Sequence, residues 1–162
     1  MRKILFVDID GVLAVTANYS KKKRTGILNT YEFDKACVRI LNQIVTDTDS
    51  YIVLSSDWRD TYNLTEMNNI FQYNKIESPI IDFTPCLWGT RFFEYSSLHE
   101  CRAEEILQYV KDNNIENYMV VDDLDLGKWF DDEHYVRCKL SNEGLKQLSI
   151  KEKIIKRFNR GE

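Results

Sequence analysis

The segment FVDIDGVL at residues 6–13 decides the fold. It completes a short apolar run that starts at Ile4, and it places two carboxylates, Asp8 and Asp10, one residue apart directly after that run. Carboxylates at the end of a buried strand are costly to desolvate unless a cation or solvent compensates them. The segment therefore predicts either a solvated loop that ends the strand or a metal site, and a second acidic cluster is needed to favour the metal.

Two further apolar runs end in the same way. Residues 51–54 are followed by Ser55, and residues 118–121 are followed by Asp122 and Asp123. Continuous apolar runs without alternation are typical of strands that are covered on both faces. Helix-periodic segments separate these runs, so we expect an α/β fold with a three-layer, doubly wound, Rossmann-like parallel sheet. Ligands bind outside the carboxyl ends of such strands, where the acidic residues should converge.

Apolar spacing and capping residues indicate the remaining elements. Apolar residues on one face predict a helix over residues 31–45, and two weaker strands are expected over residues 80–83 and 135–140. Three more helices are expected to open at capping boxes formed by Asn63 with Glu66, Ser97 with Glu100, and Ser149 with Glu152.

Length and composition predict one folded domain over residues 1–162. The chain is 43% hydrophobic, which is enough apolar surface to exclude a disordered chain. Its formal net charge of −4 excludes a protein-wide positive field, so any contact with nucleic acid must be local.

The cysteines and the N-terminus indicate a cytoplasmic protein with no membrane partner. The four cysteines show no Cys-x-x-Cys pairing, so we expect buried thiols rather than a zinc site. The apolar run at residues 4–7 is too short for a signal peptide, and no later run could span a membrane. The cysteines are Cys37, Cys86, Cys101 and Cys138.

The acidic residues predict a magnesium site. Asp8, Asp10 and Asp122 cannot share one edge of a sheet in ionised form without a divalent cation between them. Oxygen ligands without paired His or Cys favour Mg²⁺. A metal ion beside a second carboxylate is suited to phosphoryl transfer through an aspartyl-phosphate.

In order and spacing, these motifs resemble those of the haloacid dehalogenase (HAD) superfamily of phosphohydrolases. The resemblance covers residues 4–126 and includes the Asp8–Val12 segment, Ser55, a cationic residue near position 102, and Asp122 with Asp123. The segment LSSDWR at residues 54–59 and the pair Gly144-Leu145 are similar to the HAD domains of RNA-repair proteins and of phage polynucleotide kinase-phosphatases.

The resemblance implies a role for each motif residue. Asp8 would be the nucleophile and a Mg²⁺ ligand. Asp10 would be the general acid and base, and its backbone carbonyl would bind the metal. Asp122 and Asp123 would complete the metal site. Ser55 would donate hydrogen bonds to the phosphoryl group, with Ser56 as the alternative.

The family usually has a lysine before the second acidic cluster, and the resemblance implies that a cation should also stand there in this sequence. Arg102 takes its place in the sequence order and could hold phosphate as a fixed, bidentate cation. Arg91 and Lys128 are the alternatives for this role. Gly11 is expected to make a sharp turn beside the phosphate, where a side chain would obstruct the substrate.

Two short insertions stand where related proteins carry cap domains. Residues 11–31 would form a flap, and residues 60–97 a short insertion, so the site should be open enough to admit polymer ends. Within the flap, Lys22 and Arg24 are candidates to contact a polyanionic substrate, although the run Lys21–Arg24 is also compatible with a solvated hairpin tip.

A group of aromatic and basic residues could provide a platform for stacking bases, although packing in the core and loops explains them equally well. These residues are Trp58, Arg59, Trp88, Arg91, Phe92 and Phe93. The sequence thus favours a Mg²⁺-dependent phosphomonoester hydrolase that acts on nucleic-acid 3′-phosphate ends or nucleotides. Two alternatives stay open: a phosphatase of small metabolites or phosphoproteins, and a non-catalytic phosphate-binding module. A partner chain that supplies a kinase or ligase step is compatible with the function on nucleic-acid ends.

Overall fold

The centre of the molecule is a five-stranded parallel sheet. The computed structural model describes residues 2–19, 32–87 and 97–161. The sheet confirms the predicted α/β fold with doubly wound topology, because every pair of neighbouring strands is parallel. In spatial order the strands are β3 (Ile80–Phe83), β2 (Tyr51–Leu54), β1 (Lys3–Val7), β4 (Asn117–Asp122) and β5 (Tyr135–Arg137).

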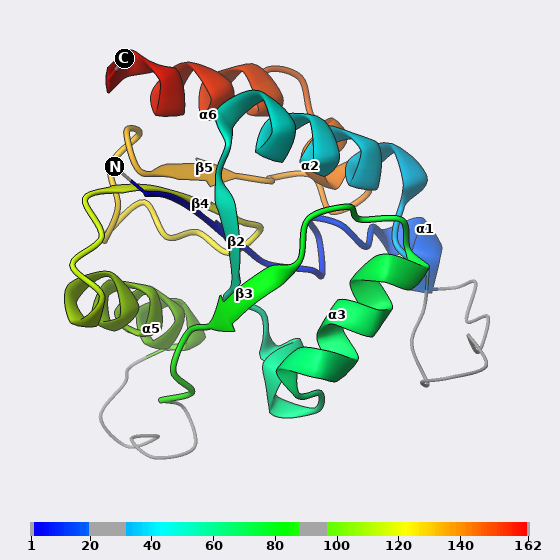
Figure 1. Cartoon of the computed structure of the whole chain (residues 1–162), viewed down its shortest axis with the longest axis horizontal. Helices are drawn as coiled ribbons and strands as arrows, with labels where there is room; N and C mark the ends of the chain where they lie inside the picture. The colour runs from blue at the N-terminus through cyan, green and yellow to red at the C-terminus, as the bar shows by residue number, and fades with distance from the viewer. Residues whose placement is uncertain (1, 20–31, 88–96, 162) are drawn as a thin grey trace.

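Helices cover both faces of this sheet (Figure 1). Alternate apolar residues of the strands point to opposite faces, so each face has its own core. Helices α2, α3 and α6 pack on one face and α5 packs on the other. The α-helices are α1 (Thr16–Tyr19), α2 (Lys35–Thr48), α3 (Leu64–Tyr73), α5 (Leu98–Asp112) and α6 (Ile150–Phe158). Short 3₁₀ helices are η1 (Asp57–Asp60), η2 (Gly144–Lys146) and η3 (Asn159–Gly161).

The strand register aligns the carboxyl ends of the three central strands. Val7 of β1 pairs with Leu54 on one side and with Val121 on the other. The backbone N–H of Asp8 donates to the Val121 carbonyl at 3.1 Å, and that of Ser55 donates to the Val7 carbonyl at 3.1 Å. Asp8, Ser55 and Asp122 therefore leave the sheet at the same level.

Two predicted boundaries are wrong by a few residues. Helix α2 begins at Lys35 because Asp34 caps it, accepting hydrogen bonds from the backbone N–H groups of Ala36 and Cys37. Residues 32–34 precede the helix and lie outside it. The last strand ends at Arg137 rather than at residue 140, since only one more ladder bond follows, from Cys138 N–H to the Asp122 carbonyl.

The predicted caps have three different outcomes. Asn63 and Glu66 form a reciprocal capping box, as expected. Ser97 accepts a hydrogen bond from the N–H of Glu100 and caps α5. The cap at Ser149 is wrong: this residue adopts a left-handed conformation with φ of 70°, and its side chain makes no capping hydrogen bond.

The segment after β5 packs onto the loop after β1. Leu145 N–H donates to the Val12 carbonyl at 3.0 Å, and Thr16 N–H donates to the Ser141 carbonyl at 3.0 Å. Gly144 has φ of 56°, and a Cβ atom there would collide with the Val12 carbonyl oxygen. Only glycine allows this approach, so the two loops are fixed to each other.

Buried thiols are found at Cys37, Cys101 and Cys138, as predicted, but the prediction is wrong for Cys86. This residue is exposed because it follows Pro85 in the loop that leaves the edge strand β3. No described helix combines the length and the apolar character that crossing a membrane requires.

Candidate active site

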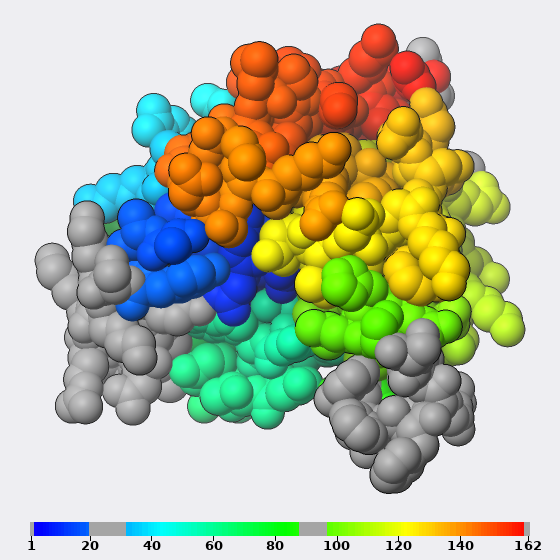
Figure 2. All heavy atoms as spheres, turned by 180° about the vertical axis from the view of Figure 1, so that it is seen from behind, coloured from blue at the N-terminus to red at the C-terminus, as the bar shows by residue number. Residues whose placement is uncertain are grey.

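The loops that follow β1, β2 and β4 form a polar site at the carboxyl edge of the sheet. On the face shown in Figure 2, blue atoms of the β1 loop are bordered by teal, yellow and orange atoms of the segments that follow β2, β4 and β5. Three buried side chains, those of Asp8, Ser55 and Asp122, belong to this edge. The convergence of acidic residues expected from the sequence is therefore present.

Asp8, Asp122 and Asp123 form an acidic cluster. Each offers one carboxylate oxygen, and these oxygens lie within 4.8 Å of one another. Asp8 is 5% exposed and Asp122 is fully buried. Such a group of oxygen donors fits the ligand preference of Mg²⁺. The side chain of Asp10, also predicted as a metal residue, is not a member of this cluster of described residues.

The protonation of the cluster supports the same assignment. Burial, followed by the negative charge of Asp8, raises the pKa of Asp122 to about 7. Burial and the Asp8 charge likewise raise the pKa of Asp123 to about 6. Burial raises the pKa of Asp8 despite the opposing effects of Arg102 and of a hydrogen bond from Ser56. A divalent cation among these oxygens would offset the cost of burying three neighbouring carboxylates in ionised form, so the residues fit a Mg²⁺ ion.

Arg102 supplies the positive charge of the site. Its side chain is 4% exposed. One guanidinium nitrogen, Nη1, lies 2.8 Å from Asp122 Oδ2 and 3.4 Å from Asp8 Oδ1. The other, Nη2, lies 2.7 Å from Asp57 Oδ1. These carboxylates raise the pKa of Arg102 above its already high usual value.

The two alternatives to Arg102 are placed differently. Lys128 is exposed, and its ammonium lies 5.1 Å from the centre of the Trp129 ring. Arg91 lies outside the described residues. Of the three candidates, Arg102 is therefore the one that the described structure brings to Asp8.

Ser55 and Ser56 are both buried at the end of β2. The hydroxyl of Ser56 hydrogen-bonds to Asp8. The hydroxyl of Ser55 has no hydrogen-bond partner among the described residues. A buried polar atom without a partner is costly, so Ser55 is the better candidate to bind a substrate oxygen.

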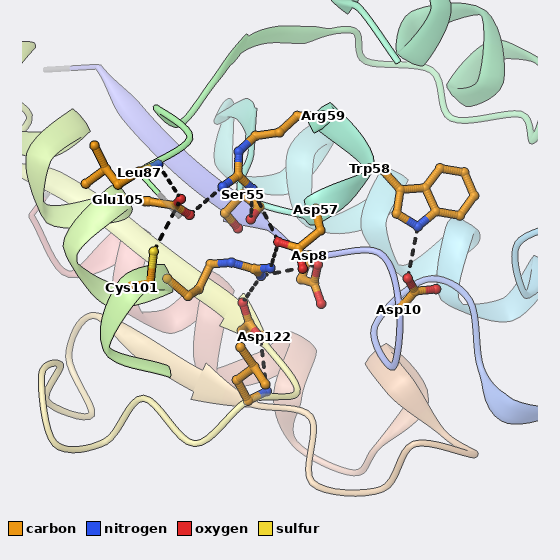
Figure 3. A network of polar contacts seen from close by, with 12 residues as sticks. Asp8, Asp10, Ser55, Asp57, Trp58, Arg59, Leu87, Cys101, Glu105 and Asp122 are labelled. Carbon is orange, nitrogen blue, oxygen red and sulfur yellow. Dashed lines mark hydrogen bonds and ion pairs between the residues drawn. The ribbon is translucent and has the colours of Figure 1, made fainter. Parts of the chain in front are cut away.

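Asp10 lies on the other side of Asp8 from Asp122 (Figure 3). Its Oδ2 atom accepts a hydrogen bond of 2.9 Å from the indole Nε1–H of Trp58. This arrangement keeps the Asp10 carboxylate apart from the acidic cluster. A carboxyl group outside the cluster is suited to transfer protons.

Gly11 has the positive φ expected of a sharp turn, at 76°. The group that excludes a side chain there is Asp123, since a Cβ atom on Gly11 would lie 2.6 Å from Asp123 Oδ2. The N–H of Gly11 contacts the hydroxyl of Tyr19 at 2.9 Å. Burial and the nearby Asp10 raise the pKa of this tyrosine to about 12.

Arg59, a candidate to bind the substrate, is buried in a structural ion pair. The side chain of Arg59 is 3% exposed, pairs with Glu105, and donates from Nη1 to the Ser55 carbonyl at 2.7 Å. It therefore holds the loop after β2 rather than facing solvent. The other basic and aromatic candidates lie outside the described residues: Lys22, Arg24, Trp88, Arg91, Phe92 and Phe93.

Sequence reasoning missed Glu105, Tyr19 and the contact of Trp58 with Asp10. Glu105 is 2% exposed, and it joins Arg59 of the β2 loop to the Leu87 N–H of the β3 loop. A signal for Glu105 was present, because Arg102 and Glu105 occupy buried positions of α5 that a periodic apolar pattern assigns to hydrophobic residues.

A protein-family model matches most of the chain. Residues 4–150 match the family described as HAD domain in Swiss Army Knife RNA repair proteins. No curated protein and no solved structure matches the sequence.

Proposed function

The chain belongs to this family of HAD domains of RNA repair proteins, which suggests a HAD-type hydrolase, and we propose that it is a Mg²⁺-dependent phosphomonoester hydrolase that acts through an aspartyl-phosphate on Asp8. The observation that carries this proposal is the meeting of the Asp8, Asp122 and Asp123 oxygens within 4.8 Å, with Arg102 Nη1 at 3.4 Å from Asp8. Fixed charges of both signs around a buried carboxylate suit phosphoryl transfer, which depends on positioning and electrostatic stabilisation.

In the first step, a carboxylate oxygen of Asp8 attacks phosphorus, and the bond from phosphorus to the leaving oxygen breaks. Asp10 donates its proton to that oxygen, so the product leaves as an alcohol. Arg102 and the hydroxyl of Ser55 bind the oxygens of the phosphoryl group. Mg²⁺, when held by Asp8, Asp122, Asp123 and the Asp10 carbonyl, would supply charge neutralisation for the phosphate.

In the second step, water attacks the phosphorus of the aspartyl-phosphate. Asp10, now ionised, accepts a proton from that water, and the bond between phosphorus and Asp8 breaks. Inorganic phosphate leaves, Asp8 is again a carboxylate and Asp10 again carries its proton. The two steps together consume one phosphomonoester and one water.

The proposed substrates are phosphorylated nucleic-acid ends, with 3′-phosphates as the preferred class. Support comes from the family itself, whose HAD domains occur in RNA repair proteins. Further support comes from the 60–97 insertion, whose described part is α3 and β3, an integral piece of the sheet. A site without a large lid would admit a polymer end.

Phosphate release tests the proposal directly. The wild type is assayed with and without Mg²⁺ on an aryl phosphate, on mononucleotides, and on oligonucleotides with a 3′- or a 5′-phosphate. We expect Mg²⁺-dependent release, highest on 3′-phosphate ends, and its loss in Asp8→Asn. Asp131→Asn, which alters an exposed carboxylate away from the site, is the matched control and should retain wild-type rates.

Each contrary result removes a different part of the proposal. No Mg²⁺-dependent release from any substrate would leave the non-catalytic phosphate-binding module. Release from small phosphates alone would replace nucleic-acid ends by small metabolites as the substrate class. Full activity of Asp8→Asn would remove Asp8 as the nucleophile.

A further inference from the structure

The contact between Trp58 and Asp10 connects two segments that are far apart in the sequence. Trp58 lies in η1, directly after β2, and Asp10 lies in the loop after β1. The indole Nε1–H donates to Asp10 Oδ2 at 2.9 Å. Figure 3 shows this pair to one side of the network around Asp8 and Asp122.

Aromatic neighbours hold the indole ring in place. Phe33 meets Trp58 edge to face, with ring centres 5.6 Å apart and an angle of 69° between the planes. Tyr62 packs against the same ring at 5.8 Å. Phe33 in turn contacts Phe71, which is 1% exposed. The ring is therefore anchored to the core, and its orientation does not depend on Asp10.

The indole can affect proton transfer only through orientation. Its N–H is a donor without acceptor capacity, so Trp58 can neither take nor relay a proton from Asp10. The anchored ring thereby fixes the orientation of the Asp10 carboxyl group, and a donor fixed in advance needs no reorganisation during the reaction.

We infer that Trp58 is a positioning residue for the general acid and base, holding Asp10 by Oδ2 in the orientation in which its carboxyl group gives the proton to the leaving group and takes the proton from water. This inference rests on the proposed function, in which Asp10 has both roles. Trp58 itself touches neither the substrate nor the reacting atoms.

Trp58→Phe tests the inference because it keeps an aromatic ring between Phe33 and Tyr62 and removes the N–H, together with part of the volume of the indole. On alkyl phosphates and 3′-phosphate ends, whose leaving groups need a proton, we expect kcat to fall about 10- to 100-fold with KM changed less than about threefold. On an aryl phosphate with a good leaving group, formation of the phosphoenzyme should stay fast while its hydrolysis slows. Stopped-flow measurement should then show a burst of product in the first turnover.

Two controls separate this role from a structural one. Trp129→Phe makes the same chemical change at a tryptophan outside the network and should leave kcat unchanged. In an Asp10→Asn background, Trp58→Phe should cause little further loss, since a residue that acts through Asp10 has no effect once Asp10 cannot carry the proton. An indole N–H resonance that moves in Asp10→Ala and disappears in Trp58→Phe would report the contact without any assay of activity.

The outcomes distinguish this inference from the proposed function. Wild-type turnover with unchanged kcat in Trp58→Phe overturns the inference alone. The inference alone is also overturned if Trp58→Phe changes only KM, or if it causes a full additional loss of kcat in the Asp10→Asn background. The same holds if the indole N–H resonance does not move in Asp10→Ala. Absence of Mg²⁺-dependent turnover in the wild type overturns the proposed function and the inference together.

Discussion

The guanidinium of Arg102 lies 2.8 Å from the carboxylate of Asp122, and both side chains are almost completely removed from solvent. A buried pair of this kind contributes little net stability compared with apolar residues, but removal of one partner leaves the other charge uncompensated. Substitution of either residue should therefore lower the stability of the fold.

Arg102→Ala should lower the free energy of unfolding at neutral pH by about 3 kcal/mol, because Asp122 and Asp8 lose their buried cation. Urea denaturation measures this change. The exposed pair of Arg137 with Asp125 offers a matched comparison, and Arg137→Ala should cost less than about 1 kcal/mol. Equal effects of the two substitutions would contradict the importance assigned to burial.

Mg²⁺ should stabilise the folded protein, since the acidic cluster exists only in the native state. At a concentration about 100 times the dissociation constant, the expected gain is about 2.7 kcal/mol. Thermal unfolding with and without Mg²⁺ measures it, and Asp123→Asn should reduce the shift while Asp131→Asn preserves it. A wild-type melting temperature that Mg²⁺ does not change would argue against the metal site.

In the absence of metal, stability should decrease as the pH rises from about 4 to about 7. The folded-state pKa values of Asp122, about 7, and of Asp123, about 6, lie above their usual range, so the folded state binds protons more tightly than the unfolded state. This contribution is complete at low pH and is lost as the pH rises through those values.

Urea denaturation with a chelator at several pH values checks this prediction. Asp122→Asn should flatten the dependence, and saturating Mg²⁺ should oppose the loss because the metal binds the ionised carboxylates. A metal-free stability that rises steadily over the same interval would show that the acidic cluster does not govern the profile.

Gly11→Ala should destabilise the protein by about 1–3 kcal/mol and weaken Mg²⁺ binding. The new Cβ atom would occupy a left-handed conformation and lie 2.6 Å from Asp123 Oδ2, so both the backbone and Asp123 must shift. Calorimetric titration with Mg²⁺ and urea denaturation measure the two effects. Gly127→Ala is the control, because a Cβ atom there would lie at an ordinary 3.5 Å from Asp125 Oδ1.

The sheet and the acidic cluster could be predicted because their signals are local. Each strand is a short apolar run, and each acidic residue directly follows a run, so strand order and parallel pairing suffice to bring Asp8 and Asp122 together. The capping box at Asn63 is equally local, since its partner Glu66 is three residues away.

The remaining contacts could not be predicted because they depend on side-chain packing between distant segments. Trp58 reaches Asp10 across 48 positions of the sequence, and Arg59 reaches Glu105 across 46. Nothing near either residue indicates its partner. The failed cap at Ser149 has a similar cause, because a left-handed backbone at that position overrides the preference of serine for helix starts.

The attachment of Gly144 and Leu145 to Val12 has a consequence for the order in which the protein matures on the ribosome. Synthesis proceeds from the N-terminus, so the strand that carries Asp8 is made first. Its neighbour β4 and the support for its loop come from residues 117–122 and 144–145. A nascent chain that ends before Leu145 thus holds Asp8 in an unfinished loop, and the loop gains its support only once that later segment has been made.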